Sequence, residues 1–280
     1  MEWLYGRNVA QLVLAAGARR RAHRLAATAP ALKALGAALP AGLPVEVRAA
    51  SELDELTGSR DHQGVAVQVD AFRYAPPEAA LAAEVVVVLD EVTDPRNLGA
   101  VARSALAAGA GCLVVPRHRS AAVTPAAVKA SAGTVEHLPV AQVTNVVAFL
   151  KQAKAAGFWV YGAAGEAATS YLGLDLGGRV VLVFGAEGRG LRPLVARTCD
   201  GLAGIPMRPP VESLNVSVAA ALFLYEARRQ RAAAAPAEES PRRVAPGPGN
   251  APGHPHGPAG PPAPGAPPAR GRSQPDPRSR

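Results

Sequence analysis

Short stretches of alternating apolar and polar residues open this 280-residue chain, within residues 1–72. Residues 44–48 and 64–69 alternate as half-buried strands do. Residues 5–18 instead repeat apolar positions at helical spacing. These patterns predict a small α/β unit. The next segment, residues 73–83, contains two adjacent prolines, and we interpret it as a linker.

From residue 84 the pattern becomes a regular alternation of apolar strands and amphipathic helices. Residues 84–89 form a continuous apolar run, which is typical of a strand covered on both faces. The alternation predicts an α/β domain with a parallel sheet over residues 84–232. The other expected strands are 112–115, 158–162 and 180–184, and the expected helices are 97–108, 145–156, 191–198 and 213–231.

The C-terminal segment, residues 233–280, has a different composition. Proline, glycine, alanine and arginine dominate it, and large apolar residues are almost absent after Val244. Such a segment buries too little apolar surface to offset the entropy lost on ordering. The composition therefore predicts a disordered basic tail.

Composition limits the classes of function. The formal net charge is +8, which favours a polyanionic partner. Residues 231–280 hold seven Arg and three acids, so +4 of that charge lies at the C-terminal end. The two cysteines make no disulfide or metal framework, and Cys112 and Cys199 are expected to be ordinary buried thiols. With no apolar run of membrane-spanning length and no signal-peptide pattern at the start, we expect a cytoplasmic protein.

Polar residues with candidate chemistry follow the first strand of the second domain. Asp94 and Pro95 form a typical helix start, with Asp at the N-cap and Pro at the first helical position. Asn97 and Arg103 lie off the apolar stripe of that helix. Open α/β sheets bind ligands at the carboxyl ends of their strands, so these two residues are candidates for a site.

Two later segments add to this candidate site. Glu187 lies in a glycine-rich turn that follows the strand 180–184. Such an acid is commonly a solvated turn residue, and a glycine-rich loop alone is weak evidence. Ser213 and Asn215 stand at the start of the last helix, where Ser213 is expected to be the N-cap and Asn215 is a poor helix former. Neither a dinucleotide fingerprint nor a Walker loop is present.

Together, three segments resemble the motifs of the SpoU/TrmH branch of the SPOUT RNA methyltransferases. They are residues 90–104, 183–190 and 205–220. The resemblance implies a trefoil-knotted α/β domain that uses S-adenosyl-L-methionine (SAM) to methylate a ribose 2′-hydroxyl, without a metal, as a homodimer. Residues 5–9 and 62–65 resemble signatures of a subgroup with a ribosomal-protein-like RNA-binding domain, and the chain is most similar to its bacterial members that methylate a guanosine of large-subunit rRNA.

The resemblance assigns roles to individual residues. It places a catalytic arginine at Arg103 and a substrate-orienting asparagine at Asn97. Arginine holds its proton strongly, so binding a phosphate and stabilising the developing alkoxide fits Arg103 better than acting as a base, although the latter stays open. The remaining expected site residues are Glu187, Ser213 and Asn215. Main-chain groups expected at the cofactor are those of Gly185, Ile205 and Leu214.

Several alternatives remain open. The RNA could be tRNA, or the protein could be a non-catalytic RNA-binding assembly factor, and the rRNA could be free or in a pre-ribosomal particle. The basic run 19–24 is either a solvated helix end or a phosphate contact. The apolar side of the last helix suits either the core or a dimer interface. It contains Leu214, Val218, Ala221, Leu222 and Tyr225.

Overall fold

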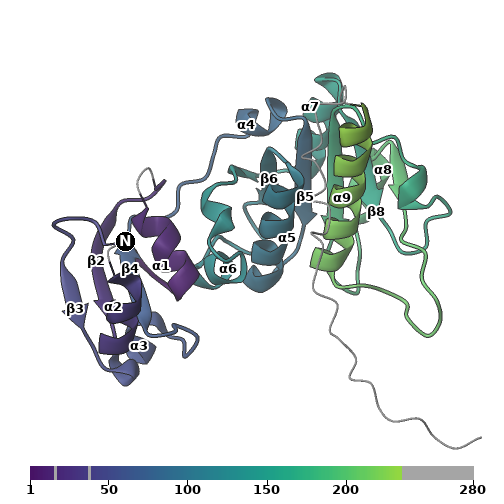
Figure 1. Cartoon of the computed structure of the whole chain (residues 1–280). Coiled ribbons are helices and arrows are strands. Elements are labelled where there is room, and N and C mark those ends of the chain that lie inside the picture. Colours follow the sequence, from purple (N-terminus) through teal and green to yellow (C-terminus); the bar gives the residue numbers. More distant parts are fainter. Residues whose placement is uncertain (16–17, 37–38, 235–280) are drawn as a thin grey trace, which may run out of the picture. The chain divides into compact units, whose positions relative to one another are not determined.

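A computed structural model describes residues 1–15, 18–36 and 39–234, which form two separate sheets (Figure 1). The expected disordered tail lies outside these residues, apart from its first two positions. Within the described part of the chain, no helix is both long and apolar enough to cross a bilayer.

The N-terminal sheet has four strands in the order β1-β4-β2-β3. β4 pairs antiparallel with both β1 and β2, and β3 pairs parallel with β2. This confirms the expected α/β unit, although several short elements were not predicted. The elements are β1 (Glu2–Tyr5), α1 (Arg7–Leu14), β2 (Ala22–Ala27), α2 (Ala29–Leu35), β3 (Val45–Val47), α3 (Ala50–Thr57) and β4 (Val65–Val69).

Of the two expectations for the basic run 19–24, the helix end is wrong, because α1 ends at Leu14 and β2 begins at Ala22. The phosphate contact is excluded for Arg20 and stays a prediction for the exposed Arg19 and Arg21. Arg20 is buried, and its Nε donates to Oε2 of the buried Glu136 at 2.9 Å, while its guanidinium also pairs with Glu2. Arg20 therefore joins the N-terminal sheet to the segment before β7 and is not available to a phosphate.

The expected linker has structure of its own. It contains the short helix α4 (Glu78–Leu81), and Ala75 forms an isolated parallel bridge with Ala141. The Ala75 N–H donates to the Val140 carbonyl at 2.8 Å.

The second sheet is entirely parallel, in the order β10-β8-β9-β5-β6-β7, which confirms the predicted parallel α/β class. The chain runs outward from β5 through β6 to β7 and then crosses to β8, so β5 and β9 lie in the middle. The trefoil knot stays a prediction. The strands are β5 (Val85–Asp90), β6 (Cys112–Pro116), β7 (Val140–Val143), β8 (Trp159–Ala163), β9 (Val180–Gly185) and β10 (Gly201–Ala203).

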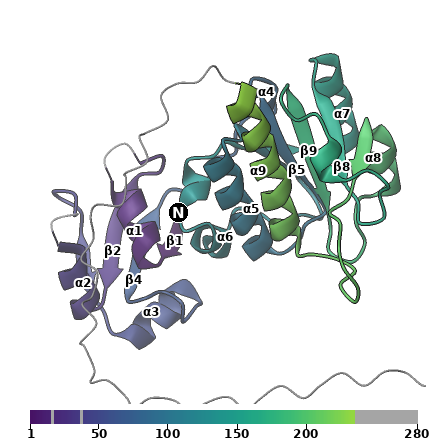
Figure 2. The same cartoon turned by 45° about the vertical axis from the view of Figure 1, so that its right-hand side comes forward.

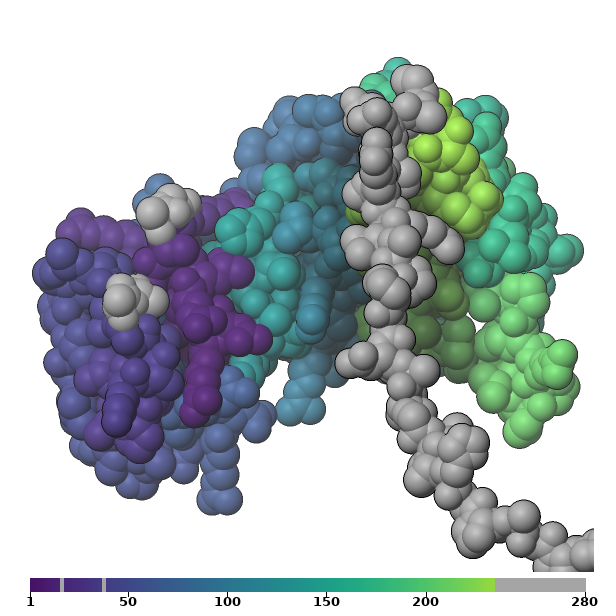
Figure 3. Space-filling view, in the orientation of Figure 1, coloured from purple at the N-terminus to yellow at the C-terminus, as the bar shows by residue number. Residues whose placement is uncertain are grey.

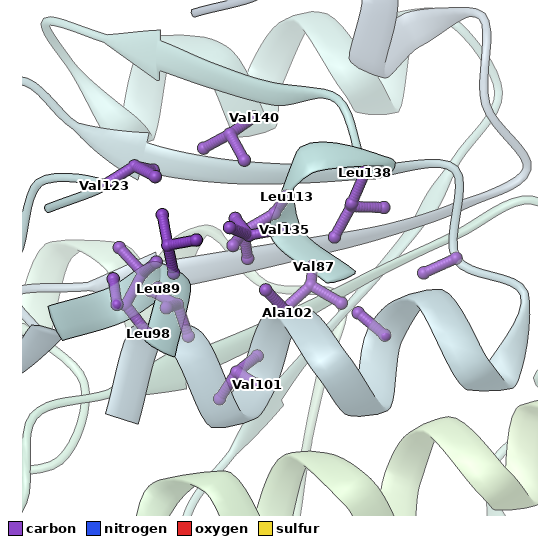
Figure 4. Packing of buried hydrophobic residues seen from close by; sticks show 14 of the residues in the cluster. Val87, Leu89, Leu98, Val101, Ala102, Leu113, Val123, Val135, Leu138 and Val140 are labelled. Carbon is purple, nitrogen blue, oxygen red and sulfur yellow. The ribbon is translucent and has the colours of Figure 1, made fainter. Parts of the chain in front are cut away.

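Helices cover this sheet, and α5 and α9 lie side by side over it (Figures 1 and 2). In the core, Val87 and Leu89 of β5 lie against Leu98, Val101 and Ala102 of α5 (Figure 4). The helices are α5 (Pro95–Ala108), α6 (Pro125–Ala130), α7 (Val146–Ala155), α8 (Pro193–Thr198) and α9 (Val216–Ala234), with 3₁₀ turns η2 (Thr134–Glu136) and η3 (Tyr171–Gly173).

One side of α9 is apolar but not part of the core. Val218, Leu222 and Tyr225 are 47%, 36% and 52% exposed, whereas Phe223 and Leu224 are buried. The stripe was expected to pack either in the core or at a dimer interface. Because these side chains are exposed, they do not pack in the core of a single chain. The segment between β10 and α9, coloured light green, protrudes from the surface of this domain (Figure 3).

Candidate active site

A cavity of about 660 Å³ opens where β8, β9 and β10 end. Its walls include the glycine-rich turn, the loop after β10 and the start of α9. Carboxyl ends of parallel strands are the usual ligand sites of open α/β sheets, and the volume lies in the range of small-molecule pockets. All three residues expected to contact a cofactor by main-chain groups line it: Gly185, Ile205 and Leu214.

The glycine-rich turn closes on itself, which explains why glycine is needed at its start. The Ala186 N–H donates to the Gly190 carbonyl at 3.1 Å, and the Gly190 N–H donates back at 2.8 Å. A Cβ on Gly185 would lie only 2.1 Å from the carbonyl carbon of Gly190. Any side chain at residue 185 would therefore force this wall of the cavity open.

Free backbone groups face the cavity from two other walls. Within the described part of the chain, the backbone N–H and C=O groups of Ile205 and Leu214 make no hydrogen bond to protein. Polar backbone groups that line a pocket without partners are suited to bind a ligand's polar edge. A cofactor recognised in this way requires no charged fingerprint in the sequence.

Each of the three motif segments contributes one polar side chain to a cluster. At its centre is Glu187, which lines this cavity. Its Oε1 accepts hydrogen bonds from Nδ2 of Asn97 at 2.9 Å and from Nδ2 of Asn215 at 2.6 Å. Nδ2 of Asn215 also donates to Oδ1 of Asn97 at 3.0 Å. We call Asn97, Glu187 and Asn215 the amide–carboxylate cluster.

Asn215, and not Ser213, caps the last helix, so the expectation that Ser213 is the N-cap was wrong. Oδ1 of Asn215 accepts from the backbone N–H of Ser217 at 2.9 Å and from its hydroxyl at 2.6 Å, and α9 begins at Val216. This is an N-cap contact. Ser213 instead lines the cavity with an exposed side chain. Ser217, which the sequence did not single out, fixes the amide of Asn215 so that its NH₂ group points at Glu187.

Arg103 lies apart from this cluster. It is exposed on α5 and does not line the cavity, and its side chain makes no hydrogen bond or ion pair with any described residue. A single chain therefore brings together four of the five expected catalytic residues. Glu187 bonds to Asn97, and no hydrogen bond or ion pair joins it to Arg103.

The described residues also bear on two other kinds of site, a metal centre and an activated thiol. They contain no group of three or more His, Cys, Asp or Glu arranged to hold a metal ion. Both cysteines are unpaired, and burial raises the pKa of the Cys112 and Cys199 thiols to about 11. Neither thiol is thus activated as a nucleophile at neutral pH.

Comparison with known proteins matches each of the two parts of the chain to a family. Residues 84–225 match the SpoU rRNA methylase family, and residues 3–75 match the RNA 2′-O ribose methyltransferase substrate-binding family. A Mycobacterium ulcerans protein named an uncharacterized tRNA/rRNA methyltransferase is 39% identical over 82% of this chain and 77% of its own length.

Two further relatives carry more specific names. The Xanthomonas campestris protein 23S rRNA (guanosine-2′-O-)-methyltransferase RlmB is 47% identical over 64% of this chain and 75% of its own length. The AdoMet-bound rRNA methyltransferase from Sinorhizobium meliloti, a solved structure, superposes with a TM-score of 0.65 at 28% identity, over 81% of this chain and 87% of that one. This chain belongs to the SpoU methylase family, and it is a SAM-dependent RNA ribose 2′-O-methyltransferase.

Proposed function

We propose that this enzyme methylates the ribose of a guanosine in large-subunit rRNA. One observation carries the catalytic part: the three motif segments converge in the amide–carboxylate cluster on the wall of a glycine-lined cavity. Intact convergence of this kind disfavours the alternative of a non-catalytic assembly factor. SAM would supply an electrophilic methyl group, so no metal and no covalent enzyme intermediate is needed.

The cofactor would be held mainly by the backbone. Gly185 lets the chain pass close to it, and the free backbone groups of Ile205 and Leu214 would bind the adenine edge. Ser213, exposed on the same wall, is placed to reach the polar end of the cofactor. These cavity-lining groups are the reason that the cavity suits SAM.

The amide–carboxylate cluster would position the substrate ribose. Glu187 holds the Asn97 and Asn215 amides in fixed orientation through one oxygen, Oε1. No hydrogen bond to a described residue occupies Oε2 of Glu187, which leaves it able to accept one from a ribose hydroxyl. Fixed groups of this kind lower the barrier by orientation rather than by chemistry of their own.

Arg103 would act in a homodimer. In one chain it is exposed and away from the cavity, yet α5 lies beside α9, whose apolar stripe is also exposed. Burial of that stripe against a second copy would bring Arg103 to the partner's cavity. There it would bind the phosphate beside the target ribose and stabilise the developing alkoxide.

The N-terminal unit, residues 1–72, favours rRNA over tRNA as the substrate. It matches a substrate-binding family, and the Xanthomonas campestris relative is named for a 23S rRNA guanosine. We place the boundary of the catalytic domain at residue 84, after the linker 73–83. The cytoplasm, where free rRNA and pre-ribosomal particles occur, is the compartment we propose.

The substrate can be tested with purified enzyme and labelled SAM. Unmodified transcripts of large-subunit rRNA, small-subunit rRNA and a tRNA set would be incubated in parallel, and 2′-O-methyl positions mapped by alkaline-cleavage resistance. We expect one guanosine of the large-subunit rRNA to be modified. Methylation of tRNA alone would overturn the rRNA assignment, and SAM binding without transfer to any RNA or assembling particle would support the non-catalytic alternative.

Sharing of the site across a dimer has its own test. Arg103→Ala and Leu214→Trp, which fills the cavity, should each be inactive as homodimers. When equal amounts of the two variants are refolded together, half of the dimers should contain one chain of each. Each of these heterodimers has one intact site of two, which predicts about a quarter of the wild-type rate. No recovery in verified heterodimers would show that Arg103 acts within its own chain or not at all.

A further inference from the structure

A second cavity, of about 330 Å³, adjoins the amide–carboxylate cluster. It shares Asn97 and Glu187 with the cluster but none of the three backbone positions proposed for the cofactor. Its other walls come from the segments that follow β5, β6 and β9, so it also lies at the carboxyl edge of the sheet. The lining residues used below are Glu91, Asn97, Arg119 and Glu187.

Glu91 occupies a conformation that ordinarily favours glycine. Its φ is +60°, in the left-handed region. The residue is clamped on both sides: Asp90 before it is fully buried, and the carbonyl of Val92 after it accepts from the Ala121 N–H at 2.8 Å. Glycine would adopt this backbone without strain, so the glutamate side chain is not explained by the turn. Strain on a cavity wall beside a catalytic cluster is typical of a functional residue.

The Glu91 carboxylate also lacks hydrogen-bond donors. Its Oε1 is buried and has no hydrogen-bond partner among the described residues. Two arginines are near it: Arg119 Nη1 at 3.3 Å and Arg192 Nη1 at 3.7 Å. Arg192 is committed to Asp90, to which its Nε donates at 2.8 Å. Glu91 Oε1 is therefore close to two cations but accepts no hydrogen bond from either, and a ligand that supplies donors would satisfy it.

Arg119 completes the second cavity from the next strand end. It also has a left-handed backbone, with φ of +56°, and its side chain is 78% exposed. The cavity therefore presents a cationic donor beside an anionic acceptor. Because the Arg119 side chain extends into solvent, it can adjust to a ligand, whereas the backbone of Glu91 is held in place.

We propose that Glu91 and Arg119 recognise the Watson–Crick edge of the target guanine, which makes them the residues that set base specificity. This inference rests on the proposed function. Guanine presents an acceptor, O6, next to two donors, N1–H and N2–H. Arg119 donates to O6, and the Glu91 carboxylate accepts from N1–H and N2–H. The ribose of a base bound there lies beside Asn97 and Glu187, where the reaction takes place.

No other RNA base matches this pair. Adenine presents a donor where Arg119 needs an acceptor and an acceptor where Glu91 needs a donor. Cytosine is mismatched in the same way, and uracil offers Glu91 one donor beside an acceptor. A base must be unstacked to be read on this edge, which is how proteins read single-stranded RNA.

Base analogues in the unmodified enzyme give the first test. The mapped target nucleoside in the large-subunit rRNA would be replaced, by splinted ligation, with inosine, which lacks the N2 amino group, or with adenosine. We expect kcat/KM for inosine to fall about tenfold or more below that for guanosine, since one good bidentate base contact gives roughly 5- to 150-fold discrimination. Equal rates on guanosine and inosine would overturn the inference.

The variant Glu91→Gln links that preference to this residue. It should lower kcat/KM on guanosine by about tenfold or more while affecting inosine less, so the ratio of the two moves toward one. SAM affinity should be unchanged, because Glu91 does not line the cofactor cavity. Glu78→Gln, an exposed carboxylate on α4 whose side chain bonds to no described residue, serves as the matched control.

Failure of this inference is distinct from failure of the proposed function. A folded, SAM-binding Glu91→Gln enzyme that keeps the wild-type guanosine-to-inosine ratio overturns the role of Glu91 while leaving the rRNA guanosine substrate intact. Methylation mapped to another base overturns both.

Discussion

The Asp90 carboxylate and the Arg192 guanidinium join the end of β5 to the start of α8. Asp90 is fully buried, and its Oδ1 accepts from Nε of Arg192 at 2.8 Å while its Oδ2 accepts from the Arg192 backbone N–H at 3.0 Å. Hydrogen bonding to Asp90 raises the pKa of Arg192. Because the turn that carries Glu187 ends just before Arg192, this pair fixes the position of that turn.

We therefore expect Arg192→Ala to lower both stability and cofactor affinity. It removes the guanidinium from a buried carboxylate, which then keeps only the backbone N–H of residue 192, and costs at most about 3 kcal/mol of unfolding free energy. Denaturant unfolding and SAM titration would measure the two effects. Arg197→Ala, an exposed arginine on α8 with no side-chain partner among the described residues, is the control and should be close to wild type. An unchanged SAM affinity in Arg192→Ala would show that the glycine-rich turn keeps its position without the Asp90–Arg192 pair.

Two substitutions separate the role of Asn215 as the cap of α9 from its role as an amide donor to Glu187 and Asn97. Asn215→Asp keeps the oxygen that caps α9 but replaces the amide donor facing Glu187 with a second carboxylate. Thermal stability should stay near wild type, whereas single-turnover methyl transfer should fall at least about tenfold, because both hydrogen bonds that the amide donates, to Glu187 and to Asn97, are lost. Asn215→Ala loses both roles and should also destabilise the protein by about 1 kcal/mol. Wild-type transfer by Asn215→Asp would remove the Glu187 contact from the mechanism.

Replacement of Arg103 should abolish methyl transfer without affecting the cofactor. Arg103→Ala removes an exposed side chain that bonds to no described residue, so folding and SAM affinity should be retained. Arg103→Lys keeps the charge but loses the planar fork, and it too should be severely impaired. Single-turnover transfer of labelled methyl to RNA, with SAM titration alongside, measures both, and Lys151→Ala on α7 is the control. Near-normal transfer by Arg103→Ala would exclude a catalytic role.

Glu226 gives the protein a pH-dependent contribution to stability. It is buried on α9, and hydrogen bonds from Arg229 at 2.7 and 2.8 Å and from Gln230 at 2.8 Å lower its pKa to about 2. A lowered pKa stabilises the folded state above the unfolded value, near 4.3, and this contribution is lost as the pH falls toward 2. Because Arg229 is 67% exposed, solvent screening limits this contribution to the free energy of unfolding to about 1 kcal/mol.

Glu226→Gln should therefore be less stable than wild type at about pH 6, and the gap should narrow by about pH 3. Urea unfolding at both pH values measures it. A gap that widened on acidification would contradict the lowered pKa.

The sequence by itself determined the class of the second domain and the segments of its site. Continuous valine runs such as 85–88 are long enough and apolar enough to identify buried parallel strands without tertiary information. Asp94 and Pro95 start α5 as expected, because an N-cap acts through neighbouring residues alone. The sequence also determined that the last motif supplies a cap to α9, but not which of its two polar residues does so.

Some short strands in both sheets escaped prediction for a physical reason. β2 contains alanine, arginine and histidine, and β10 has only three residues, so neither shows a strand pattern of its own. Their extended state is imposed by pairing, β2 with β4 and β10 with β8. Strand propensity reflects such packing more than any intrinsic backbone preference.

Only the tertiary structure decided which side chains meet. Asn97 lies 90 residues from Glu187 and 118 from Asn215, and no local pattern encodes contacts at such separations. Folding likewise turned Arg20 from a candidate RNA contact into a buried partner of Glu136, and left the apolar stripe of α9 exposed. Local chemistry fixes caps, turns and strand character, whereas burial and long-range pairing depend on how the whole chain packs.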